Sequence, residues 1–152
     1  MTSLATDPAF AALLADSYQR FVGKPLIPQD IPAADVARWL YEDAPFVVLS
    51  HNTDPDPCFV YANRTAQRCF EYNWDEFITL RSRFSAEEVN REERARLLDD
   101  VREKDYSSDV RGQRIAKSGR RFWIENCIVW NLVDRDGTYR GQAAIFTDWP
   151  DA

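Results

Sequence analysis

The chain has 152 residues, of which 45% are apolar and 13% aromatic, and its formal net charge is −6. This size and composition predict a globular domain. The acidic balance argues against a general nucleic-acid binder, which needs a basic surface. No stretch reaches the roughly 18 apolar residues of a membrane span, and residues 1–7 lack the features of a signal peptide. We therefore expect a cytoplasmic protein, with Cys58, Cys69 and Cys127 as reduced and mostly buried thiols.

Two helices are predicted before residue 45. Asp7 caps the first, Pro8 suits its first position, and Gly23 ends it. After a proline-rich bridge, the second runs from about residue 33 to 43 and stops before Pro45.

The central part predicts two strands and then a block of helices. The strands are 46–50 and 58–62, and the turn 54–57 joins them as a hairpin. Asn63 caps a helix to about residue 70, and 74–77 forms another helical turn. A charged helix follows at 87–104, in which the expected inward side is marked by Val89, Leu97, Leu98 and Val101, and its charges are expected to be solvated.

The last third is read as strand and turn. Strands are expected at 110–117, 121–133 and 139–148, separated by the turns Ser118-Gly119 and 134–137. Strands grouped around a helical block predict an α+β fold, with a five-stranded antiparallel sheet and helices on one face.

The order and the motifs of these elements resemble those of PAS domains. The similar stretches are Phe46 to Leu49, Phe59 to Asn63, Lys117 to Ile124, and 134–137 followed by Gly141. The chain is more similar still to the PAS-like MEKHLA family, through Ser50-His51, Tyr61 to Asn63, Ser82 to Glu87, Gly119 to Phe122, Val129 to Leu132 and Gly141 to Ala144. The resemblance implies a helical extension at 1–44 and a PAS-like domain at 45–150.

In PAS domains a ligand lies between the inner face of the sheet and the helices. Strict alternation along 121–133 groups Phe122, Ile124, Asn126, Ile128 and Trp130 on one face, and Trp123, Glu125, Cys127 and Val129 on the other. The resemblance places the first group inward. Both faces carry apolar residues, so we expect the outer face to be covered by the N-terminal helices or by a second subunit.

Seven residues are candidates for a binding site: His51, Phe70, Trp74, Arg83, Arg114, Asn126 and Trp130. If Arg83 and Arg114 point inward, they favour a carboxylate-bearing ligand; otherwise they are solvated or ion-paired arginines. Asn126 would bond backbone groups or a ligand, while Trp74 and Trp130 are either stacking walls or core. His51 is either hydrogen-bonded at the sheet edge or a polar contact at the mouth of a pocket.

The residues do not identify a cofactor. The reactive cysteine of light-sensing flavin PAS domains aligns with Ser82, and the flavin-binding amides align with Arg114, Ile124 and Ala143, which argues against flavin photochemistry. Haem ligation would rest on His51, the only histidine. No catalytic or metal-binding motif is evident, so we expect a non-enzyme without a metal.

Two functions of different class remain. The first is a sensory module that binds a small molecule between sheet and helices and signals through contacts with a separate protein. The second is a ligand-free interaction module, a homodimer formed through the N-terminal helices and the face that carries Trp123 and Val129.

Overall fold

The computed structural model describes residues 4–152 and contains one five-stranded antiparallel sheet. The spatial order of the strands is β2-β1-β5-β4-β3. The first strand in the sequence, β1, therefore pairs with the last, β5, in the middle of the sheet. The strands are β1 (Val47–His51), β2 (Phe59–Ala62), β3 (Tyr106–Ile115), β4 (Arg121–Val133) and β5 (Tyr139–Phe146). The predicted α+β, PAS-like architecture is confirmed.

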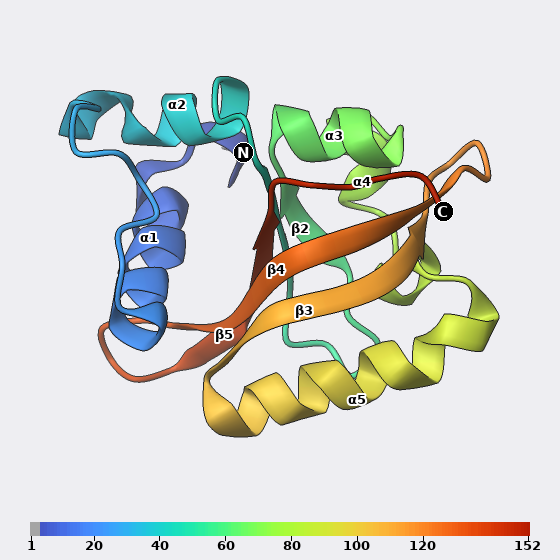
Figure 1. Ribbon diagram of the computed structural model, residues 1–152. Coiled ribbons are helices and arrows are strands. Elements are labelled where there is room, and N and C mark those ends of the chain that lie inside the picture. Colours follow the sequence, from blue (N-terminus) through green and yellow to red (C-terminus); the bar gives the residue numbers. More distant parts are fainter. Residues whose placement is uncertain (1–3) are drawn as a thin grey trace.

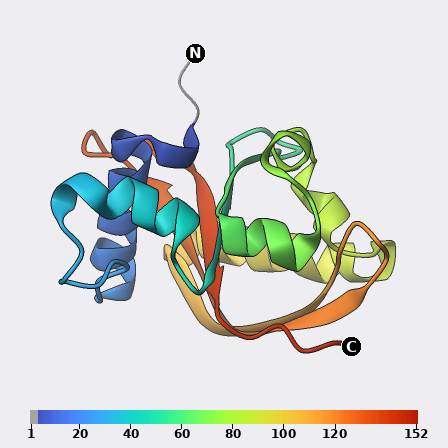
Figure 2. The same ribbon diagram turned by 90° about the horizontal axis from the view of Figure 1, so that it is seen from above.

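Helices lie on both faces of the sheet (Figures 1 and 2). One side carries α1 (Pro8–Val22) and α2 (Val36–Glu42). The other carries α3 (Arg64–Phe70), α4 (Trp74–Phe77), the 3-10 turn η3 (Ser82–Ser85) and the long α5 (Glu88–Lys104). Seen from above, the sheet lies between the two groups of helices (Figure 2). A separate cluster of buried apolar side chains packs on each face of the sheet.

The N-terminal helix covers the outer face of the sheet. Its start is fixed by the Asp7 side chain, which accepts a hydrogen bond from the Ala9 amide, and its end by Gly23 at φ 84°. Tyr18 packs edge-on against the Trp130 ring at 4.9 Å between centroids. The outer face was expected to be covered either by the N-terminal helices or by a second subunit. Over Trp130 it is covered by the N-terminal helices.

Asn63 ties the helical block to the sheet. Its side-chain oxygen accepts hydrogen bonds from the amides of Ala66 and Val48, and its nitrogen donates to the carbonyl oxygens of Phe46 and Leu40. One side chain therefore caps α3 and fixes the start of β1.

The long helix α5 packs against the inner face with Leu97, Leu98 and Val101. Val89, which was expected on the same side, is instead 84% exposed. That expectation was wrong because Val89 lies in the first turn of α5, beyond the part of the helix that packs on the sheet.

A bulge at Asn126 reverses the alternation of β4. Asn126 has φ 52°, which is the left-handed region, and it is exposed. Phe122 and Ile124 before it belong to the inner core, as do Cys127 and Val129 after it. The expectation that Asn126 and Trp130 face inward was therefore wrong, since strict alternation does not hold across a bulge and Trp130 packs on the outer side.

Strand β3 begins at Tyr106, before the predicted residue 110. Its early residues are polar, and Asp109 at φ 57° marks an irregular pairing with β4, so the period-2 signal is absent there. All three cysteines are free thiols, and Cys69 and Cys127 are buried. Among the helices formed by residues 4–152, none has both the length and the apolarity needed to cross a membrane.

Candidate functional site: a cavity between α5 and the sheet

A small cavity, here called the inner cavity, lies between α5 and the inner face of the sheet. Its volume is about 40 Å³, which is room for a few water molecules or a very small ligand. Most of its wall is apolar. Its lining consists of Leu49, His51, Phe70, Ser85, Arg94, Leu97, Leu98, Arg114, Ile124, Cys127, Val129, Gln142, Ala143, Ala144 and Phe146.

Two arginines enter this apolar wall from different elements. Arg94 comes from α5, on the same helical stripe as Leu97, Leu98 and Val101. Arg114 comes from β3, is only 9% exposed, and donates one hydrogen bond, to the carbonyl oxygen of Gln113 at 2.8 Å. Glycine at position 112 leaves space for it, because a Cβ there would lie 2.9 Å from Nη1 of Arg114.

No acidic side chain lines the inner cavity itself, but Glu93 lines an adjoining depression with both arginines and lies near enough to attract Arg114. Within the described residues 4–152, neither arginine forms an ion pair, and Arg94 makes no hydrogen bond. Burial first and the neighbouring Arg114 second lower the pKa of Arg94 to about 9, and burial also lowers the pKa of Arg114. Burial raises the pKa of the Cys127 thiol to about 12, so this neighbour is neutral and does not balance the two cations.

His51 presents an unpartnered nitrogen at this site. It is 6% exposed, and Nδ1 lies 3.0 Å from the carbonyl oxygen of Asn52, so Nδ1 carries the proton. Burial lowers its pKa to about 4, which keeps the ring neutral at pH 7. Nε2 is then a buried acceptor that forms no hydrogen bond in the part of the chain that the structure describes, although the Gln142 side chain lies close enough to His51 to oppose part of the lowering of its pKa.

A polar row crosses three strands beside the cavity. Gln142 pairs with His51 on one side and with Asn131 on the other. The Gln142 amide nitrogen donates to the carbonyl oxygen of Leu98 and to Oδ1 of Asn131. Asn131 in turn donates to the carbonyl oxygens of Val101 and Arg102. The row therefore fastens the C-terminal half of α5 to the sheet.

A larger depression, the outer groove, adjoins the inner cavity. It has a volume of about 530 Å³ and runs between the β1–β2 loop, η3 and α5. A groove of this size lies within the range of ligand pockets. The residues that line both spaces, and so mark the passage between them, are His51, Arg94, Leu98 and Gln142.

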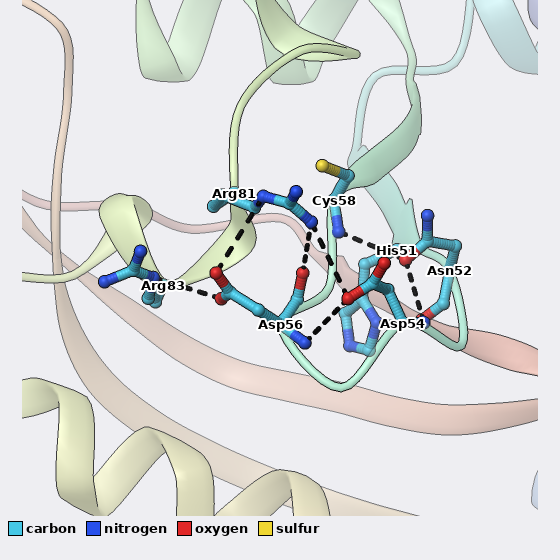
Figure 3. A network of polar contacts seen from close by, with 7 residues as sticks. All are labelled: His51, Asn52, Asp54, Asp56, Cys58, Arg81 and Arg83. Atoms are coloured by element: carbon cyan, nitrogen blue, oxygen red, sulfur yellow. Dashed lines mark hydrogen bonds and ion pairs between the residues drawn. The ribbon is translucent and has the colours of Figure 1, made fainter.

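Ion pairs hold the β1–β2 loop along this groove (Figure 3). Asp56 accepts a hydrogen bond from Nε of Arg83 at 3.0 Å, and its carbonyl oxygen accepts one from Arg81 at 2.6 Å. Asn52 closes the loop by accepting hydrogen bonds from the amides of Asp54 and Cys58. Figure 3 shows these residues gathered around the bend that follows His51.

The structure brings together three of the seven predicted site residues. His51, Phe70 and Arg114 line the inner cavity. Arg83 lines the outer groove, where it is half exposed and paired with Asp56, so it does not point inward.

The other three predicted residues lie away from the cavity. Trp74 packs edge-on against Tyr41 and Tyr61, and Trp130 packs under α1. Asn126 is exposed at the bulge. For Trp74 and Trp130 the structure matches the core alternative and not the stacking walls. The inward placement of Asn126 and Trp130 was wrong because it relied on uninterrupted alternation in β4.

Sequence reasoning missed Arg94 and Gln142. A signal for Arg94 was present, since positions 94, 97, 98 and 101 share one face of a helix and only the first is charged. Gln142 follows Gly141 in a stretch that resembles the MEKHLA family.

The ligand-free interaction hypothesis requires Trp123 and Val129 to lie together on one outer face of the sheet, and the structure does not place them so. Val129 is 5% exposed and lies in the inner core. Trp123 does lie on the other face, where the Arg111 guanidinium stacks over its ring at 3.9 Å. The two residues therefore do not share an outer face.

Among the described residues, no group of three or more His, Cys, Asp or Glu side chains is placed to hold a metal ion. Ser82, the position aligned with the photoreactive cysteine, is fully buried beside the outer groove, and its Oγ has no partner there.

The fold is that of a PAS domain. The PAS domain of a protein from Colwellia psychrerythraea superposes with a TM-score of 0.63 at 12% identity, over 76% of this chain and 92% of that one. A PAS domain from a two-component sensor histidine kinase gives 0.58 at 18% identity, over 76% of this chain and 93% of that one. An RNA-binding light-oxygen-voltage receptor gives 0.64 at 22% identity, over 84% of this chain but 36% of the receptor.

The family can be named more closely. The MEKHLA domain model matches residues 8–151, and the chain belongs to the MEKHLA domain family. The match includes both N-terminal helices, α1 and α2, as well as the sheet. No curated protein matches the sequence.

Proposed function

We propose that this protein is a sensory module that binds a small molecule in the inner cavity and transmits its occupancy through α5 to a separate protein. The observation that carries the proposal is the unpartnered Nε2 of His51 in the wall of that cavity. A buried acceptor without a donor is costly, and a ligand that donates to it removes the cost.

The polar row supports α5 as the element that responds. Gln142 lines the cavity and also bonds the Leu98 carbonyl of α5. A ligand that moves Gln142 therefore acts directly on the bonds that hold α5. A signalling partner, a homodimer, a cytoplasmic location, the absence of catalysis and the division into an extension (1–44) and a domain (45–150) all stay predictions.

Two measurements test the binding proposal. Native mass spectrometry and an absorption spectrum of the freshly purified protein detect a retained ligand, and thermal unfolding with a metabolite panel detects an added one. A ligand of the folded state raises Tm. If nothing is retained and no compound raises Tm, the proposal is refuted.

A variant that fills the inner cavity tests whether the ligand that raises Tm binds there. Ala144→Leu places a branched side chain in the inner cavity and should abolish the rise in Tm. Ala12→Leu adds the same volume at an exposed site on α1 and should leave it intact. An equal response of both variants would place the ligand elsewhere.

A further inference from the structure

Arg114 is buried and Arg94 is partly buried, and the two cations face one cavity that no anion lines. Arg94 and Arg114 both line the inner cavity, and no acidic residue lines it with them. Guanidinium groups stay protonated in proteins, so their positive charge cannot be relieved by deprotonation at neutral pH. An isolated buried charge is unfavourable unless it is paired.

Arginines that stabilise a fold are usually compensated within it, and this protein offers examples. Arg83 pairs with Asp56, and Arg111 pairs with Glu125 and stacks on Trp123. Arg114 instead bends over Gly112 and reaches the cavity with a single backbone bond. Glu93 is near Arg114 but forms no ion pair with it within residues 4–152. The contrast indicates that a directly bonded partner comes from outside the chain.

We propose that the inner cavity binds a short-chain carboxylate, whose carboxylate group lies between the guanidinium groups of Arg94 and Arg114. The inference rests on the proposed function and adds the class of ligand. Guanidinium matches the planar carboxylate with two parallel hydrogen bonds. The small volume limits the ligand to a few carbon atoms, and walls such as Phe70 and Val129 accept its apolar part.

His51 adds a second element of recognition. Its Nε2 is an acceptor without a donor. An ionised carboxylate cannot donate to it, and the two guanidinium groups are taken up by the carboxylate. A hydroxyl on the ligand supplies the donor. The cavity therefore favours a short hydroxycarboxylate over the corresponding simple acid.

The probes are sodium lactate, sodium propionate, propionamide and inorganic phosphate, compared by thermal unfolding at equal concentration, ionic strength and pH. We expect a rise in Tm of several degrees with lactate, a smaller one with propionate, and none with propionamide or phosphate. An equal effect of propionamide or of phosphate would overturn the carboxylate assignment. Propionate acting as strongly as lactate would overturn the role of His51.

Variants separate binding from folding. Arg94→Met removes an unpaired cation from the cavity, so it should raise Tm without ligand and abolish the lactate response. Arg96→Met, an exposed arginine on the same helix, should change neither. A retained lactate response in both Arg94→Met and Arg114→Met would refute the proposal.

The outcomes for ligand class and for function are distinguishable. If a neutral metabolite raises Tm while every carboxylate fails, the protein remains a sensor but the carboxylate proposal falls. If neither neutral nor charged compounds raise Tm, both fall together.

Discussion

Arg94 of α5 and Arg114 of β3 line one cavity, and within residues 4–152 neither guanidinium forms an ion pair with a carboxylate. The helix and the strand are thus held together across a pair of like charges. Leu97, Leu98 and the Asn131–Gln142 row provide the attraction that offsets this repulsion. Occupation of the cavity by an anion would change the balance between the two.

The polar row makes a first prediction. Asn131→Ala removes the hydrogen bonds to the Val101 and Arg102 carbonyl oxygens and should lower the free energy of unfolding by about 2–3 kcal/mol. Hydrogen exchange should speed up in the C-terminal half of α5. Asn90→Ala, which loses one bond to the Gln113 side chain at 3.3 Å, is the matched control and should have a small effect. Equal losses in the two variants would argue against the row as the fastening of α5.

The bulge in β4 makes a second prediction. Asn126 has φ 52°, a conformation that Asn and Gly adopt readily and a β-branched residue does not. Asn126→Val should therefore cost about 1–3 kcal/mol, while Asn126→Gly should have little effect. Urea denaturation compares the two variants, and the account of the bulge fails if valine is tolerated as well as glycine.

Two glycines, Gly141 in β5 and Gly112 in β3, make a third. A Cβ on Gly141 would lie 2.1 Å from the His51 carbonyl oxygen, and Gly141 has φ 128°. Gly141→Ala should therefore be severely destabilising, because the obstacle is backbone. A Cβ on Gly112 meets only the end of the Arg114 side chain, so Gly112→Ala should fold normally and weaken the lactate response by moving that guanidinium. The reverse ranking of stabilities, measured by denaturation, would contradict the structure.

The buried histidine predicts a pH dependence of stability. The pKa of His51 falls from 6.5 to about 4 on folding, mainly through burial. The unfolded state therefore binds the proton more tightly between these values, and stability is lost as the pH falls from about 6.5 to about 4, by roughly 3 kcal/mol at the lower end. Chemical denaturation across this range measures the loss. His51→Gln should have a flatter profile there, and a profile as steep as that of the parent would show that other groups are responsible.

The parts of the fold that follow local rules were predictable from the sequence. Asp7, Gly23 and Asn63 are capping residues whose side chains or backbone preferences act within a few positions. The strand β4 was expected over its full length, 121–133, because its apolar and β-branched content is continuous. The resemblance to the PAS and MEKHLA families supported the same order of elements along the chain, whereas the order of the strands within the sheet comes from the structure.

The site was less predictable, for reasons that are physical. Because Asn126 has a left-handed backbone conformation, the strand bulges there and Trp130 lies on the outer face. The alternation of apolar and polar residues in the sequence does not predict this bulge. Arg94 was hidden among the many charges of α5 because burial depends on the elements packed against a helix. His51 could be predicted because it ends an apolar strand, whereas Arg114 was a candidate only as an arginine that could point inward, since β3 is mostly polar.

A crystal structure of the protein grown with lactate tests the central claim most directly. The account predicts density for the ligand in the inner cavity, with its carboxylate in contact with the guanidinium groups of both Arg94 and Arg114 and its hydroxyl next to Nε2 of His51. A cavity filled by water or by side chains at saturating lactate, or lactate bound at another place on the surface, would contradict it.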